Sequence, residues 1–132
     1  MIDINCLGGN EFLKMLYPSG LDSTIMIKDI TISVNGVSEF SFFVKQKPDI
    51  NVKKWGTWNN EFNCLWIKTA NYCNFKILTT SNLNKMGFNC LSMKKNEDGN
   101  IKIQSTKGDS ELFMVLDIND RFIVQEILPI NI

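Results

Sequence analysis

From residue 24 onward, apolar and polar side chains alternate, and this period of two commits most of the chain to β-strands. The run 24–34 is rich in β-branched residues and places Ile30, Ile32 and Val34 on one face. Asn35-Gly36 follows this run and is typical of a hairpin turn. Further strands are predicted at residues 62–68, 72–78, 88–94, 100–105, 111–117 and 122–127, with turns at 96–99 and 119–120.

The alternation also predicts the length of the hairpin loop. A two-residue loop at Asn35-Gly36 would put Glu39 on the apolar face and leave Phe40 on the polar one. A three-residue loop with Gly36 in the left-handed region pairs Ile30 with Phe40 instead. Because a slip of one residue moves every side chain to the opposite face, burial favours the three-residue loop.

One helix is predicted, at residues 10–17, where Asn10 can act as the cap and Phe12, Leu13 and Leu16 fall on one side. The strand at 62–68 is apolar on both faces, so we expect it to be central and covered on both sides, with Trp66 in the core. These elements predict a mainly β fold, either an antiparallel β-sandwich or a strongly curved β-meander of about eight strands with one short N-terminal helix. The length of 132 residues fits a single β-rich domain, 1–132.

The residues that most often carry chemistry are scarce. The chain has no histidine, and its only arginine is Arg121. Histidine is the usual proton-transfer group near neutral pH and the commonest metal ligand, and arginine is the usual clamp for phosphate. No phosphate-binding glycine loop or serine–lysine motif is present either. We therefore expect no enzyme, no catalytic residues, no cofactor and no metal site.

The cysteines are interpreted as small buried hydrophobes, because Cys6, Cys64, Cys73 and Cys90 are too far apart for a zinc or redox motif. The N-terminus has neither a basic region nor an apolar stretch typical of a signal peptide, and no run is long enough to span a membrane. A cytoplasmic protein without a membrane partner is the resulting expectation.

Charge is balanced overall but uneven along the chain. The 14 basic and 14 acidic residues cancel, which argues against a nucleic-acid partner. Residues 41–107 nevertheless carry eleven lysines and four acidic residues, while the flanking segments are net acidic. Either the fold interleaves these blocks, or a lysine-rich face meets an acidic partner.

The segment 45–66 combines four lysines and three tryptophans around a connection rich in proline, glycine and asparagine. Trp55 and Trp58 fall in this connection, where they either plug the end of the sheets or stand exposed. Exposed aromatic rings beside lysines are typical of a protein-interface hot spot, and they can also stack on sugars. The candidate partner-binding residues are Lys53, Lys54, Trp55, Trp58 and Asn59.

Several segments of the chain form a series that points to a known family. In chain order they are the turn Tyr17-Pro18-Ser19-Gly20-Leu21, the alternating hairpin at 25–44, Pro48 with Lys54-Trp55, Phe62-Asn63 at the start of a strand, Phe75-Lys76-Ile77, and the last strand at 122–127. Taken together, these segments resemble the immunity protein 50 family of bacterial polymorphic-toxin systems.

The resemblance implies a small cytoplasmic binder that neutralises a cognate protein toxin by stoichiometric contact and needs no catalytic residues. An alternative is a carbohydrate-binding β module that uses Trp55 and Trp58 as a stacking platform. Exposed strand edges leave a homo-oligomer open as well.

Overall fold

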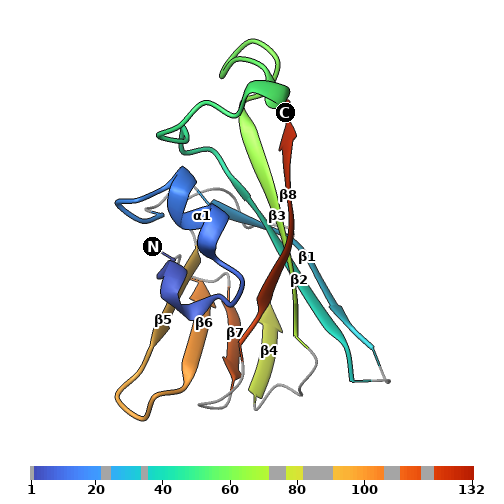
Figure 1. Ribbon diagram of the computed structural model, residues 1–132. Helices are drawn as coiled ribbons and strands as arrows, with labels where there is room; N and C mark the ends of the chain where they lie inside the picture. The colour runs from blue at the N-terminus through green and yellow to red at the C-terminus, as the bar shows by residue number, and fades with distance from the viewer. Residues whose placement is uncertain are drawn as a thin grey trace.

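The computed structural model describes residues 2–21, 25–33, 36–71, 77–81, 91–105, 111–116 and 121–132, and strands dominate them (Figure 1). The first sheet has the order β1-β2-β3-β8 and consists of β1 (Ile25–Ile32), β2 (Ser38–Val44), β3 (Cys64–Asn71) and β8 (Ile123–Ile130). The second sheet has the order β4-β7-β6-β5 and consists of β4 (Ile77–Ser81), β7 (Glu111–Leu116), β6 (Ile101–Ser105) and β5 (Leu91–Lys95). Neighbouring strands within each sheet are antiparallel. The predicted mainly β, antiparallel fold is confirmed.

The hairpin between β1 and β2 has the predicted register. Ile30 pairs with Phe40, and the Ser33 amide donates to the Val37 carbonyl oxygen at 3.0 Å. Gly36 has φ 90°, the left-handed conformation that the three-residue loop requires. Farther from the turn, the register shifts between Ile27 and Asp29, which makes a β-bulge in β1.

Most of the other predicted strands are found with shifted ends, but the strand predicted at 72–78 shares only residues 77 and 78 with β4, and part of several predictions lies outside the described residues. This applies to residues 72–76, 88–90 and 117, and to the turn expected at 119–120. The turn at 96–99 is confirmed, because the Gly99 amide donates to the Asn96 carbonyl oxygen at 3.1 Å. The side chain of Asn96 accepts two further backbone hydrogen bonds, which fixes the turn.

Helices are few among the described residues. They are α1 (Glu11–Leu16) and the 3₁₀ helices η1 (Ile4–Cys6) and η2 (Lys53–Trp55). Leu13 and Leu16 are buried as predicted, whereas Phe12 is 39% exposed. Asn10 occupies the cap position, but its side-chain amide donates backward to the carbonyl oxygens of Ile4 and Leu7, at 3.0 and 2.9 Å, instead of capping α1.

The N-terminal segment, residues 2–8, is hydrogen-bonded to both sheets. The Asp3 amide donates to the Met93 carbonyl oxygen in β5 at 2.9 Å. The Val124 amide in β8 donates to the carbonyl oxygen of Gly8, also at 2.9 Å. One hydrophobic cluster accordingly includes side chains from this segment, from α1 and from strands of both sheets.

Strand β3 lies between β2 and β8, as expected for a central strand. Its inward side chains Leu65 and Ile67 are fully buried. The prediction that both faces are covered holds only in part, because Trp66 and Lys68 on the opposite face are half-buried. Placing Trp66 in the core is therefore wrong: alternation turns it away from Leu65 and Ile67, toward a face that solvent reaches.

The register of the hairpin can be tested with two neighbouring residues. Phe40 is fully buried, with its ring 5.4 Å from that of Phe122, and its truncation to alanine should lower the free energy of unfolding by about 3–5 kcal/mol. Glu39→Ala, on the exposed face, should change it by less than about 0.5 kcal/mol. Urea unfolding followed by circular dichroism measures both values. Equal losses would contradict the register.

Candidate functional site

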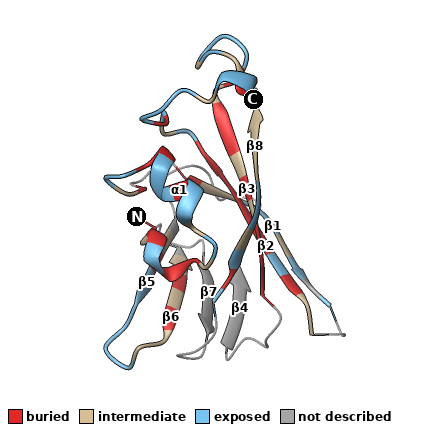
Figure 2. Cartoon of the chain, in the orientation of Figure 1, coloured by how far each residue is buried: buried red, intermediate tan, exposed pale blue. Residues whose placement is uncertain are grey.

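The connection between β2 and β3 holds all five residues that the sequence suggests for partner binding. Lys53, Lys54 and Asn59 are exposed, Trp58 is half-buried, and Trp55 is 9% exposed. Figure 2 shows this connection as mostly exposed backbone beyond the ends of β2 and β3. The structure thus brings the five residues into one connection but gives them different degrees of exposure.

The two tryptophans close the end of the core. The rings of Trp55 and Trp58 meet the Phe62 ring edge to face, with centroid distances of 5.9 and 5.4 Å. Phe12 of α1 covers Trp55 in the same manner at 5.8 Å, which also explains why Phe12 is not buried with Leu13. The sequence left open whether these tryptophans close the end of the sheets or stand exposed. Trp55 closes the end of the core, and Trp58 does so in part.

A tight turn follows Trp55. Gly56 has φ 84° and ψ −155°, a conformation that is accessible almost only to glycine. A Cβ atom at this position would lie 2.7 Å from the Cβ atom of Glu61. The Glu61 carboxylate accepts a hydrogen bond from the Thr57 amide at 2.6 Å, so it is held in place. The turn therefore fixes the path of the chain directly after Trp55.

Gly56→Ala tests this turn, and Gly20→Ala is the matched control. Gly56→Ala should destabilise the protein by about 1–3 kcal/mol through backbone strain, and further through the clash with Glu61. Gly20 also has a positive φ, of 94°, but an added Cβ meets nothing within 4 Å, so only the strain remains. Urea midpoints of the two variants should differ, with Gly56→Ala the lower. Equal midpoints would contradict the prediction, because they would mean that the Glu61 side chain moves aside at no cost in stability.

The described cysteines are poor nucleophiles. Cys6 and Cys64 are free and buried, and burial raises the pKa of each thiol to about 11. The nearby Asp3 carboxylate adds to the rise in the pKa of Cys6. Burial likewise raises the pKa of Tyr17, whose hydroxyl donates to the Gln46 carbonyl oxygen at 2.8 Å. Cys73 and Cys90 lie outside the described residues.

Alkylation of the cysteines tests their protonation. Raising the pKa of a thiol from its ordinary value of 9.0 to about 11 lowers the thiolate fraction at pH 8 by about 100-fold. Because the thiolate is the reactive form, Cys6 and Cys64 should react with iodoacetamide far more slowly in the native protein than in urea. Peptide mapping by mass spectrometry separates these sites from Cys73 and Cys90. Rapid native labelling of Cys64 would contradict the prediction.

The same shift has a consequence for stability. Because the folded pKa lies above the unfolded value, the two thiols stabilise the fold fully below pH 9, and this contribution is lost as the pH rises from 9 toward 11.

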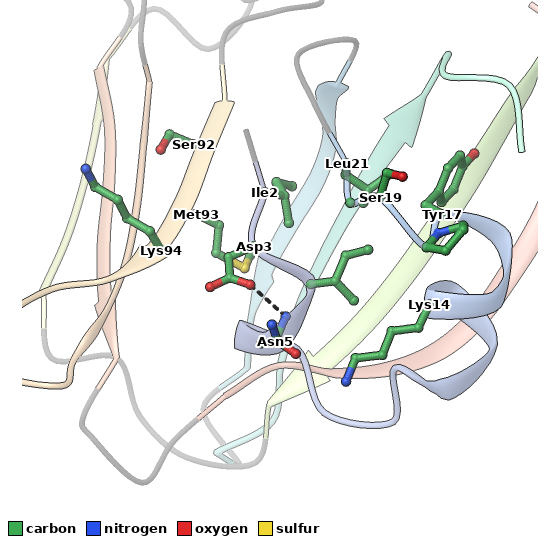
Figure 3. A pocket seen from close by; sticks show the side chains of 13 residues that line it. Ile2, Asp3, Asn5, Lys14, Tyr17, Ser19, Leu21, Ser92, Met93 and Lys94 are labelled. Carbon is green, nitrogen blue, oxygen red and sulfur yellow. Dashed lines mark hydrogen bonds between the residues drawn. The ribbon is translucent and has the colours of Figure 1, made fainter. Parts of the chain in front are cut away.

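A hollow of about 900 Å³ lies between the N-terminal segment, the turn after α1 and β5. Figure 3 shows Asp3 at its centre, with Lys14 and Lys94 extending on opposite sides. The Asp3 carboxylate already accepts a hydrogen bond from the Asn5 amide at 3.0 Å. The lining of this hollow contains no buried polar side-chain atom that lacks a hydrogen-bond partner among the described residues. Asp3, at the centre of this hollow, is also the carboxylate that helps to keep the Cys6 thiol protonated.

A second hollow, of about 520 Å³, lies on the face of the first sheet that points away from the core. We call it the outer hollow; its lining includes Asp29, Glu39, Ser41, Trp66, Lys68 and Glu126. The Lys68 ammonium lies 4.0 Å from the centre of the Trp66 ring and 3.3 Å from the Glu126 carboxylate.

Two buried polar atoms at the outer hollow lack hydrogen-bond partners among the described residues. They are the Ser41 Oγ and the Trp66 Nε1 atoms. Ser41 is 6% exposed, and a buried polar atom without a partner costs about 1–3 kcal/mol. Such atoms are rare in folded proteins, and each is normally satisfied by a further polar group or by an ordered water molecule.

Sequence reasoning missed the outer hollow because it assigned Trp66 to the core. The hairpin register nevertheless indicated a polar outer face. The register that buries Phe40 places Glu39 and Ser41 on the opposite face.

Comparison with known proteins identifies no relative: no family model, no curated protein and no solved structure matches the chain. The resemblance to the immunity protein 50 family therefore stays a prediction from the sequence.

The described residues also contain no group of three or more cysteine, aspartate and glutamate side chains placed to hold a metal ion. Within the same part of the chain, no helix combines the length and apolar character needed to cross a membrane.

Proposed function

We propose that this chain is an immunity protein, which binds a cognate protein toxin in the cytoplasm of the producing bacterium and neutralises it stoichiometrically, without catalysis. The observation that carries the proposal is the outer hollow, where a half-buried tryptophan and two unpartnered polar atoms lie on an open sheet face. Tryptophan in a partly desolvated pocket is among the residues that contribute most to protein–protein affinity.

The surroundings of Trp66 support a protein partner. Phe43 packs edge to face against Trp66, with a centroid distance of 6.1 Å, and is itself 9% exposed. Lys68 and Glu126 border the ring with polar groups that remain partly exposed, at 38% and 51% of their side-chain surface. An aromatic centre within a polar rim is the usual anatomy of a protein interface.

The carbohydrate alternative has weaker support. A stacking platform needs two ring faces that are open to solvent, whereas Trp55 is 9% exposed and is enclosed by Phe12 and Phe62. Trp58 alone offers part of its surface, beside a small hollow of about 310 Å³ that it lines together with Phe62.

We further propose that the two sheets form the halves of a β-sandwich. Support comes from the shared hydrophobic cluster, to which β2 and β3 contribute from one sheet and β5 and β6 from the other. In this arrangement each sheet has an inner face on the core and an outer face that is free for binding.

Co-production with the cognate toxin, first identified by pull-down from the native organism and mass spectrometry, tests the proposal. The chain should restore growth and form a 1:1 complex detectable by size-exclusion chromatography. Trp66→Ala should weaken the complex by about 30-fold, because truncating such an anchor costs about 2 kcal/mol or more. Trp58→Ala, in the connection between β2 and β3, is the matched variant. Circular dichroism and urea unfolding verify that both variants are folded.

Two results would contradict the proposal. The first is the absence of both complex and growth rescue. The second is a change in tryptophan fluorescence on adding oligosaccharides that Trp58→Ala abolishes, which would support the carbohydrate alternative.

A further inference from the structure

The rim of the outer hollow is acidic although the whole chain is neutral. Asp29 of β1, Glu39 of β2 and Glu126 of β8 supply three carboxylates to the lining, which contains one lysine, Lys68; a second lysine, Lys28, approaches Asp29 from outside the lining. The strand register explains this grouping, because Asp29 pairs with Ser41, Ser41 with Lys68, and Lys68 with Glu126 across the sheet. All of these side chains therefore lie on one face.

The carboxylates differ in how far they are already neutralised. Glu126 is 3.3 Å from Lys68, while Asp29 meets Lys28 at 3.7 Å in an exposed pair. Exposed ion pairs of this kind contribute little to the free energy of unfolding. Glu39 is exposed and makes no ion pair with the other described residues. The β1 and β2 side of the hollow thus retains negative charge that a cation can meet.

A buried and unpartnered side chain lies in the same hollow. Ser41 is 6% exposed, and its Oγ atom finds no partner among the described residues. The Trp66 indole N–H is likewise unpaired and can only donate, so it needs an acceptor such as a backbone carbonyl oxygen. These carboxylates do not form a group suited to a metal ion. A ligand that provides both cationic side chains and backbone carbonyls is a peptide segment.

We propose that the outer hollow docks a basic loop of the partner protein, with its arginine or lysine side chains on Asp29 and Glu39 and its backbone on Trp66 and Ser41. This inference rests on the proposed function and specifies the chemistry of the partner. It reverses the expectation that the lysine-rich middle of the chain meets an acidic surface, because the open hollow on the first sheet carries the opposite charge.

A synthetic peptide of four Arg-Gly repeats is the probe, and a peptide of four Glu-Gly repeats is its control. In two-dimensional NMR, the Arg-Gly peptide should shift the Trp66 indole N–H signal and the amide signals of residues 39–41 in a saturable manner. D29K/E39K should raise the dissociation constant at least tenfold. E97K/D98K, which makes the same charge change in the exposed turn at 96–99, should leave it unchanged.

Shifts that spread equally to Glu97 and Asp98, or equal shifts with the Glu-Gly peptide, would overturn the inference. Concentration-dependent self-association that D29K/E39K abolishes would overturn it as well, because the occupant would then be a second copy of this chain.

Measurements on the toxin complex separate the inference from the proposed function. Peptide binding at the outer hollow without any toxin complex would support the inference and remove the proposed function. A toxin complex that D29K/E39K leaves intact and K53E/K54E weakens would support the function and overturn the inference. Loss of the complex in D29K/E39K, with E97K/D98K unchanged, would support both.

Discussion

Backbone hydrogen bonds from residues 2–8 are the constraint on which the rest of the structure depends. They join β5 at Met93 and β8 at Val124, which belong to different sheets, so both sheets are held against one hydrophobic cluster. The helix that follows is fixed in turn, because the Asp49 amide donates to the carbonyl oxygen of Leu16 at 2.8 Å. A short stretch of chain thereby sets the position of the sheets, of α1 and of the connection between β2 and β3.

This arrangement decides which tryptophans are available to a partner. Phe12 of α1 and Phe62 enclose Trp55 at one end of the core, so that ring contributes to stability. Trp66 lies on the opposite face of β3 from Leu65 and Ile67 and keeps part of its surface in solvent. The difference follows from position: the chain encloses the Trp55 ring at the end of the core, whereas Phe43 and Lys68 cover the Trp66 ring only in part on the outer sheet face.

Alternation of side chains was enough to predict the hairpin register, since a single slip would have exposed Phe40 and buried Glu39. It could not predict what lies over each face, and this is why Trp66 was assigned to the core. The burial of Trp55 depends on Phe12, far away in the sequence, and local composition carries no information on such a contact. The prediction that Asn10 caps α1 was wrong for a similar reason. Its side-chain amide donates to carbonyl oxygens of the preceding segment, which local composition does not reveal.

The β-bulge in β1 affects how molecules of this chain meet one another. β1 is an edge strand, so its free backbone groups could otherwise serve as a template for strands of neighbouring copies. The extra residue at the bulge is Lys28, which interrupts the regular spacing of those groups and places a charge beside them. A bulge and a charge at an edge strand are features that disfavour the regular pairing on which fibril growth depends.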